Sequence, residues 1–174
     1  WTNSNNLNTQ RRQGGGAGTV TAGLVFGGRD PDAGVTNTEE YDGTDWTAGG
    51  TLNQSTRNNA GAGTQTASIV AGGDSGRGNY KTETETWQGS AWTEVSELNT
   101  ARATLASIGH TNTAALAVGG TPSPGNNAVE SWNGSSWTEV ADLNSARCFL
   151  VGSGASNTAA IAYGGSEANP SQTG

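Results

Sequence analysis

The sequence predicts an all-β protein built from repeated, short-stranded sheets, and three observations support this fold class. Tryptophans recur at a nearly constant step of 45, 46 and 45 residues, at Trp1, Trp46, Trp92 and Trp137. Each repeat contains a short apolar run that ends in a glycine pair, such as Gly119-Gly120. An aromatic residue, a glycine turn and a Trp then follow in the same order. Apolar runs separated by glycine turns are typical of antiparallel strands.

A repeat of this length in strand-rich sequence predicts one propeller blade per repeat. A lone four-stranded sheet has two faces to bury, and it buries them by stacking on further copies of itself. We therefore expect a single β-propeller segment over residues 1–174, which forms part of a ring. The predicted full blades are residues 12–47, 57–93 and 102–138, and the predicted partial blades are residues 1–5 and 147–165.

Each expected strand has a composition that fits its place in the blade. The first strand is small and glycine-rich, as in residues 14–18 and 59–63, because bulky side chains would collide near the propeller axis. The second strand carries the apolar residues and is expected to be buried on both faces. Its copies are Leu24–Phe26, Ile69–Ala71, Leu116–Val118 and Ile161–Tyr163. Gly43, Gly89 and Gly134 allow the positive φ that a tight hairpin between the third and fourth strands requires.

Three further series of residues keep step with the repeat. The aligned tryptophans are expected to be scaffold, because large rings bury much area between stacked sheets. The aligned arginines, 45 residues apart, are Arg12, Arg57, Arg102 and Arg147. The aligned glutamates, each two residues before an aromatic residue, are Glu39, Glu85 and Glu130. The two charged series follow loops on the same face, so we predict that they pair with each other or bond to loop backbone. A partly buried pair favours register more than net stability.

These landmarks resemble the kelch repeat family over essentially the whole chain. The double glycine that closes a strand, the aromatic residue before a turn, the Trp that opens the last strand and the Arg that opens the next repeat match its pattern. The resemblance implies a kelch-type β-propeller with three full four-stranded blades and parts of two more. The rival blade repeat, marked by Gly-His and Trp-Asp, fits poorly, because Gly109-His110 occurs once and Asp45-Trp46 has the reverse order.

Composition and charge argue against several classes of partner. The formal net charge of −7 and the single lysine disfavour binding to nucleic acid or to an anionic membrane. The longest apolar stretches are about half a dozen residues, so no membrane-spanning segment is expected. A single cysteine, Cys148, rules out a disulfide framework within the chain.

What varies between repeats is the loop after each glycine pair, and loops on a common scaffold are where binding surfaces are usually placed. The candidate binding residues are Arg29, Asp30 and Asp32 in the first loop, Asp74, Arg77, Tyr80 and Lys81 in the second, and Asn126 and Asn127 in the third. Arg77, Tyr80 and Lys81 together suit a carbohydrate or an acidic protein surface. The alternative interpretation is a solvated loop without a ligand.

We expect no catalytic residue, metal site or cofactor in this chain. His110 is the single histidine, and we interpret it as a turn or strand residue rather than a base or a ligand. Asp30 and Asp32 are two carboxylates without further oxygen ligands, which falls short of a Ca²⁺ site. The copper oxidases on kelch-like scaffolds need several His and Tyr ligands and a cross-linked Cys, which one His and one Cys do not supply.

The Asn-, Thr-, Ser- and Gly-rich repeats look like the kelch-like repeats of bacteriophage virion proteins and bacterial surface proteins. That resemblance implies a non-enzymatic structural or binding module on a virion or outside the cell, which contacts a glycan or protein receptor through its variable loops. The remaining blades, or other chains that complete the ring, are expected partners. Two alternatives stay open: a fragment of a kelch-type enzyme whose catalytic residues lie in other blades, and an intracellular kelch adaptor.

Overall fold

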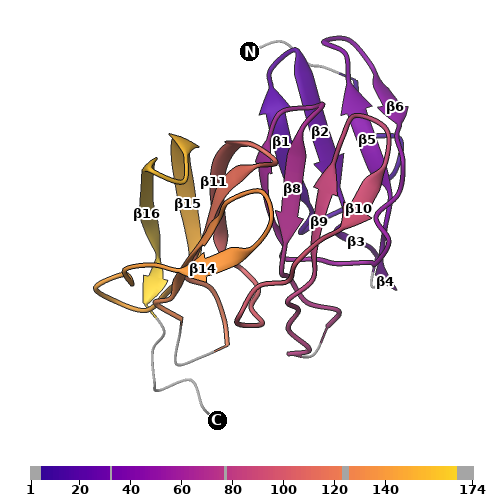
Figure 1. Ribbon diagram of the computed structural model, residues 1–174. Coiled ribbons are helices and arrows are strands. Elements are labelled where there is room, and N and C mark those ends of the chain that lie inside the picture. Colours follow the sequence, from indigo (N-terminus) through magenta and orange to yellow (C-terminus); the bar gives the residue numbers. More distant parts are fainter. Residues whose placement is uncertain (1–4, 32, 77, 123–125, 168–174) are drawn as a thin grey trace.

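The computed structural model describes residues 5–31, 33–76, 78–122 and 126–167, and these residues form strands and no helix. Three four-stranded antiparallel sheets and a two-stranded sheet stand side by side in chain order (Figure 1). We call these sheets blades one to four. The predicted all-β class and its division into four-stranded sheets are thus confirmed. The partial blade predicted for residues 1–5 lies, apart from its last residue, outside the described residues.

The strand bounds follow the repeat from blade to blade. Blade one contains β1 (Gly15–Thr19), β2 (Ala22–Phe26), β5 (Thr38–Tyr41) and β6 (Trp46–Ala48), and its loop adds the short pair β3 (Arg29–Asp30) and β4 (Ala33–Gly34). Blade two contains β7 (Ala60–Gly63), β8 (Ser68–Ala71), β9 (Thr84–Trp87) and β10 (Trp92–Glu94). Blade three contains β11 (Ala106–Thr111), β12 (Ala114–Val118), β13 (Val129–Trp132) and β14 (Trp137–Glu139). Blade four contains β15 (Arg147–Ser156) and β16 (Ala159–Glu167).

The first strands of the four blades lie against one another, β1 on β7, β7 on β11 and β11 on β15. Their small residues make this close approach possible. A Cβ added at Gly61 would overlap the Phe26 ring and lie 2.9 Å from the carbonyl oxygen of Gly16. A Cβ added at Gly152 would overlap the side chain of Ile108. The glycine-rich strands therefore sit where the blades converge, as crowding at an axis predicts.

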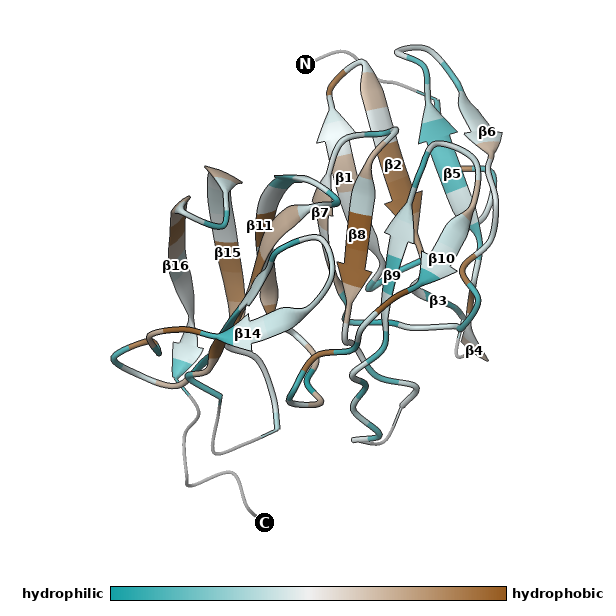
Figure 2. Ribbon diagram, in the orientation of Figure 1, coloured by the Kyte–Doolittle hydropathy of each residue, from teal (hydrophilic) through white to brown (hydrophobic). Residues whose placement is uncertain are grey.

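The second strands form much of the core of blades one to three (Figure 2), where β2 and β8 are hydrophobic and β5 and β9 are hydrophilic. Leu24, Phe26 and Ile69 are fully buried. The prediction of burial on both faces is wrong for blade four, because Ile161 is 62% exposed and Tyr163 is 51% exposed. In the described part of the chain, no further strand pairs with the edge of β16 and no further blade packs on this sheet. Each of the three earlier blades, in contrast, has the next blade packed against it.

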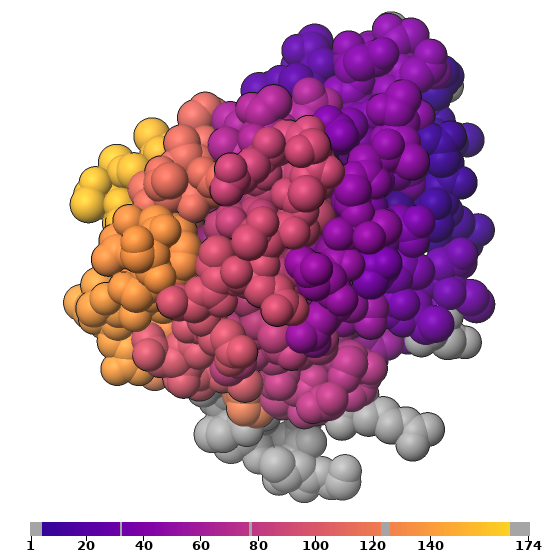
Figure 3. Space-filling view, turned by 45° about the vertical axis from the view of Figure 1, so that its right-hand side comes forward, coloured from indigo at the N-terminus to yellow at the C-terminus, as the bar shows by residue number. Residues whose placement is uncertain are grey.

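Two of the aligned tryptophans, Trp92 and Trp137, join neighbouring blades, as their predicted scaffold role requires. Trp92 Nε1 donates to Thr38 Oγ1 of the preceding blade at 2.8 Å, and Trp137 Nε1 donates to Thr84 Oγ1 at 3.1 Å. Both rings are buried between sheets. In the space-filling view (Figure 3), blades one to three accordingly pack in sequence order, and the yellow residues of blade four lie at the margin.

A second connection between blades is made by backbone in a rare conformation. Gln13, Asn58, Thr104 and Phe149 occupy equivalent positions and have φ of 61°, 52°, 53° and 56°. The N–H of each donates to the carbonyl of the one before it, from Asn58 to Gln13 at 2.8 Å, from Thr104 to Asn58 at 2.8 Å and from Phe149 to Thr104 at 2.9 Å. This series of bonds crosses all four blades. Residues other than glycine take positive φ only where the surrounding structure holds them.

Candidate functional site

The variable loops share one end of the sheets. The hairpin turns between first and second strands, and between third and fourth strands, lie toward the upper ends of their sheets in Figure 1, and the loops after β2, β8 and β12 lie toward the lower ends. Gly43, Gly89 and Gly134 have φ of 98°, 82° and 94°, which confirms the predicted tight turns at the opposite end. We call the end that carries the variable loops the loop face.

In blade one, the variable loop is a small hairpin of β3 and β4. The backbones of Arg12 and Arg29 exchange hydrogen bonds of 2.9 and 3.2 Å, and Arg12 Nη2 donates to the carbonyl of Pro31 at 2.8 Å. Arg29 and Asp30 are half-buried at this hairpin. The third predicted residue of the loop, Asp32, lies outside the described residues. This loop is therefore held to the start of its own blade.

In blade two, Asp74 organises its loop from within. The buried carboxylate accepts hydrogen bonds from Arg57 Nε at 2.7 Å, Asn58 Nδ2 at 2.6 Å and the Gly76 N–H at 2.7 Å. Burial by itself raises the pKa of Asp74, but the hydrogen bonds from Asn58, Arg57 and Gly76 outweigh it and hold the pKa below its ordinary value. Asp74 is thus engaged in the structure of the loop.

The other predicted residues of this loop are Arg77, Tyr80 and Lys81. Tyr80 is half-buried, and its backbone pairs with that of Asp74. The mostly buried Lys81 Nζ lies 3.8 Å from Glu83 Oε1 and donates to Gln54 Oε1 at 3.4 Å. Arg77 lies outside the described residues. The ammonium of Lys81 is therefore already partnered within the protein.

In blade three, the two predicted asparagines lie at the end of the loop. Asn126 Oδ1 accepts the Ala128 N–H at 2.8 Å, an Asx-type bond that shapes the entry into β13. Asn127 is exposed, and its Nδ2 donates to Asp142 Oδ2 at 3.3 Å. Each of the three loops is thus bonded to its own blade or to the linker next to it, and each presents different side chains.

Beneath the loop face, buried arginine–glutamate pairs tie the linkers before blades one and three to the blades that follow them. Arg11 Nη2 donates to Glu39 Oε1 at 2.6 Å, and Arg102 Nη2 donates to Glu130 Oε1 at 2.7 Å. The predicted pairing is confirmed for Arg102. Arg12 does not pair with a glutamate, because its neighbour Arg11 holds Glu39, but it takes the other predicted role, since its Nη2 donates to the loop carbonyl of Pro31 at 2.8 Å. Pairing with a glutamate is wrong for Arg57, which pairs with Asp74 instead.

The backbone register explains this correction. The N–H groups of Gly28, Gly73 and Gly120 each donate to a carbonyl of the following linker, and the acceptors are Thr56, Arg102 and Arg147. The position equivalent to Arg102 in blade two is therefore Thr56. The four predicted arginines, 45 residues apart, therefore occupy two different structural positions: Arg102 and Arg147 share one, and Arg12 and Arg57 lie one residue after it. The step of 46 residues between Trp46 and Trp92 was the signal in the sequence that could have revealed this difference.

Each glutamate also caps the linker backbone. Glu130 accepts the N–H groups of Asn99 at 2.8 Å and Thr100 at 3.4 Å, together with Asn99 Nδ2 at 2.8 Å. In blade one, burial by itself raises the pKa of Glu39, but hydrogen bonds from the Asn8 and Thr9 N–H groups and from Arg11 outweigh burial, so the net shift of the pKa is downward.

The arginine side of the buried pair is affected differently. Burial lowers the pKa of the Arg102 guanidinium, and the charge and hydrogen bond of Glu130 oppose that shift. The guanidinium is held by further acceptors, since Arg102 Nη1 donates to the carbonyls of Gly119 at 3.3 Å and Ala128 at 2.7 Å. The pair therefore links the linker, the glycine pair and the third strand of one blade.

A row of side-chain amides, which the sequence analysis missed, joins the blades at the opposite end. Gln65 Nε2 donates to the Tyr41 carbonyl at 2.7 Å, Asn112 Nδ2 to that of Trp87 at 3.0 Å and Asn157 Nδ2 to that of Trp132 at 3.0 Å. Each amide stands in the turn between first and second strands, and each acceptor ends the third strand of the preceding blade. In blade one this turn position is Val20, which is 91% exposed.

The converging first strands border an open hollow of about 230 Å³, which is lined by residues of all four blades. His110 borders it together with Gly16, Gly61 and Gly152. Among the described residues, no group of three or more His, Cys, Asp or Glu is placed to hold a metal ion. The same part of the chain contains no helix of the length and hydropathy needed to cross a membrane.

Comparison with known proteins gives no family for this chain, so its function is inferred from its residues and their geometry. None of the known protein-family models matches this chain, and none of the curated proteins is significantly similar to it in sequence.

Proposed function

We propose that the chain is a segment of a kelch-type β-propeller that acts as a non-enzymatic structural and binding module. The observation that carries this proposal is the contrast between scaffold and loops. The buried tryptophans, glycine pairs and glutamate caps recur from blade to blade, whereas the loops above them differ in length, charge and hydrogen bonding. Repeated scaffold with variable loops at one end is the usual design of a recognition surface.

The proposed contact surface consists of the loop residues that are not buried. These are Arg29, Asp30, Tyr80, Asn126 and Asn127, and Asp32 and Arg77 are included from the sequence. Asp74 and Lys81 are assigned a supporting role, because their charged groups are mostly buried and bonded within the protein. Amide, hydroxyl and guanidinium groups beside a tyrosine suit the hydroxyl groups of a glycan or a polar protein surface.

We further propose that the module works on the surface of a virion or outside the cell. The support is compositional: kelch-like repeats that are poor in lysine and rich in Asn, Thr, Ser and Gly resemble those of virion and bacterial surface proteins. The net charge of −7 disfavours nucleic acid as a partner. The remaining blades, or chains that complete a ring, are the proposed structural partners.

A glycan array probed with the purified chain tests the binding proposal. We expect saturable binding to a restricted set of glycans, and at least a tenfold loss with Tyr80→Ala or Asn127→Ala at unchanged melting temperature. Val20→Ala, at the opposite end of the blades, is the control and should bind as the unmodified chain does. Absence of binding across the array would refute glycan recognition by this segment and favour a purely structural module.

A further inference from the structure

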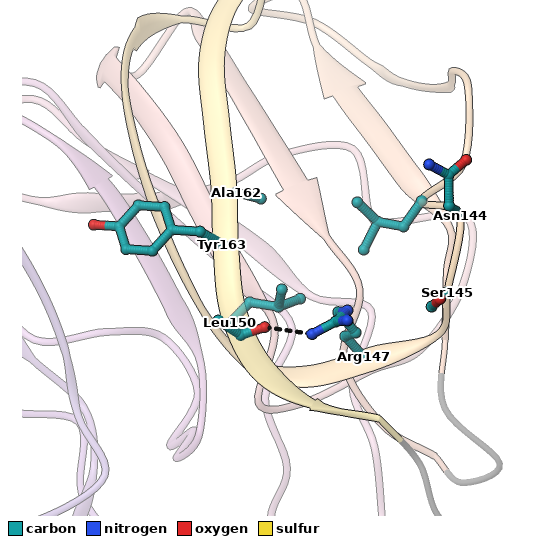
Figure 4. A pocket seen from close by; sticks show the side chains of 8 residues that line it. Asn144, Ser145, Arg147, Leu150, Ala162 and Tyr163 are labelled. Carbon is teal, nitrogen blue, oxygen red and sulfur yellow. Dashed lines mark hydrogen bonds between the residues drawn. The ribbon is translucent and has the colours of Figure 1, made fainter.

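The open side of blade four contains a hollow of about 400 Å³ beside β16 (Figure 4). Its polar wall comes from the linker before the blade, with Asn144, Ser145 and Arg147. Its apolar wall comes from Leu150 and from Ala162 on β16. The hollow therefore combines hydrogen-bond donors, a guanidinium and apolar surface at the edge of β16 that has no strand partner among the residues within 5–167 that the structure describes.

In the preceding blade, the same place is filled by a glutamate. Glu130 accepts hydrogen bonds from the N–H of Asn99, the N–H of Thr100 and Arg102 Nη2. The residues 45 positions later in the chain are Asn144, Ser145 and Arg147. Glu39 in blade one and Glu85 in blade two receive equivalent backbone bonds from their own linkers. Three internal examples thus show what kind of group belongs in this hollow.

The strand register places that group opposite one residue of the second strand. Glu130 pairs with Ala117 across β12 and β13, and Glu85 pairs with Val70 across β8 and β9. Ala162, which lines the hollow, lies 45 residues after Ala117. A strand added to the free edge of β16 in the same register would carry its glutamate directly into the hollow.

Arg147 already has the orientation that such a glutamate requires. Its Nη1 donates to the Gly164 carbonyl at 3.0 Å, as Arg102 Nη1 donates to the Gly119 carbonyl at 3.3 Å. Arg147 Nη2 donates to Glu167 Oε1 at 3.2 Å, whereas the equivalent atom in blade three, Arg102 Nη2, donates to Glu130. This Arg147–Glu167 pair is exposed, and Glu167 lies at the end of β16 rather than on a third strand.

Apolar surface beside the hollow points to the same occupant. Ile161 and Tyr163 are exposed, whereas Val118, equivalent to Tyr163, is buried in the complete blade three. An unpaired strand edge next to exposed apolar side chains is a template for strand addition.

We propose that this open side of blade four is a docking site for a glutamate-bearing β-hairpin of the repeat's own pattern. The first strand of the hairpin pairs antiparallel with β16 and places its glutamate opposite Ala162. The carboxylate accepts hydrogen bonds from the Asn144 and Ser145 N–H groups and from Arg147, displacing Glu167. This inference depends on the observed blade geometry and is independent of the proposed receptor binding.

A peptide with the sequence of residues 127–140, the third and fourth strands of blade three, is the probe. Fluorescence anisotropy with the full 174-residue chain measures its binding, and hydrogen exchange maps where it binds. We expect saturable binding with protection of the β16 amides. The Glu130→Gln peptide should bind about tenfold more weakly or worse, because it loses charge-assisted bonds. The Glu139→Gln peptide is the charge-matched control and should bind as the unmodified peptide does.

Variants of the chain locate the charge that is recognised. Arg147→Gln should remove the discrimination between the unmodified peptide and the Glu130→Gln peptide, whereas Arg12→Gln, which removes an exposed guanidinium in blade one, should retain it. No binding at millimolar peptide, equal binding of both peptides, or protection away from β16 would each overturn the proposal. Sedimentation that shows a dimer closed through β16 would also overturn it, because a second copy would then be the occupant.

Discussion

The guanidinium of Arg102 and the carboxylate of Glu130 meet at 2.7 Å, and both side chains are fully buried. The pair ties the linker that precedes blade three to the third strand of that blade. A buried ion pair adds little net stability compared with an apolar pair, but removal of one partner leaves the other charge buried without compensation.

We therefore expect Arg102→Met to lower the free energy of unfolding by about 3–5 kcal/mol. Glu130→Gln keeps some hydrogen bonds and should cost about 2 kcal/mol or more. Denaturant unfolding followed by tryptophan fluorescence measures both. Val20→Ala, at a position of blade one that is 91% exposed, is the control and should change stability by no more than about 0.5 kcal/mol. If Glu130→Gln left stability unchanged while Arg102→Met lowered it strongly, the pairing would not explain the role of the arginine.

Blade two provides the natural comparison, because Thr56 stands where blades one and three have an arginine. In the described part of the chain, Glu85 is bonded to Asn53 and Gln54 and to no arginine. We expect Thr56→Arg to raise the free energy of unfolding by about 1 kcal/mol, because the new guanidinium would reach Glu85 and the Gly72 carbonyl.

Thr56→Lys is the matched control for that prediction. It adds the same charge without the planar fork that binds carboxylate and carbonyl groups together, so its gain should be smaller. A larger gain with lysine, or a loss with arginine alone, would show that the site in blade two has been repacked around threonine. Thermal melts of the three proteins in one buffer decide between these outcomes.

The depressed pKa of Asp74 predicts a specific dependence of stability on pH. Its pKa in the folded state lies below the ordinary value of 3.8, so its contribution is fully present above that value and is lost as the pH falls through the folded pKa. We expect Asp74→Asn to destabilise the protein at neutral pH. The difference from the unmodified protein should shrink when unfolding is measured at successively lower pH below about 4. A difference that stayed constant down to about pH 2 would argue against this account.

The amide bonds between blades predict a difference between two equivalent turn positions. Asn112→Ala removes the donor to the Trp87 carbonyl, and we expect a loss of about 1 kcal/mol. Val20→Ala, in the same turn of blade one, should have an effect within about 0.5 kcal/mol, because Val20 is exposed. Equal losses from the two substitutions in chemical denaturation would mean that the amide bond does not stabilise the contact between blades.

Much of the local structure of this protein could be predicted from its sequence. The repeat step, the glycine turns and the apolar second strands depend on period and on backbone conformation, which short segments encode. Gly134, for example, has positive φ because of the tight turn of its own hairpin, and no other part of the chain is needed to explain it. The pairing of glutamates with arginines could be predicted as a class, because both series recur near the same ends of strands.

The candidate site could be predicted less completely. Asp74 looks like a loop carboxylate in the sequence, and only the fold shows it buried under Arg57 and Asn58. Ile161 looks like Ile69 in composition, but one is exposed and the other is buried, because burial depends on the neighbouring blade and not on the strand itself.

By itself, the sequence determined the all-β class, the repeat and the turns, since these follow from spacing and from what glycine permits. Only the tertiary structure decided which arginine meets which glutamate. The buried positions at Thr56 and Arg102 are 46 residues apart, so Arg57, which is 45 residues before Arg102, lies outside the buried position. The backbone bonds between blades reveal this equivalence. The carboxylate position that we propose beside Arg147 likewise depends on the tertiary structure, because Glu39, Glu85 and Glu130 fill the equivalent positions in the three preceding blades.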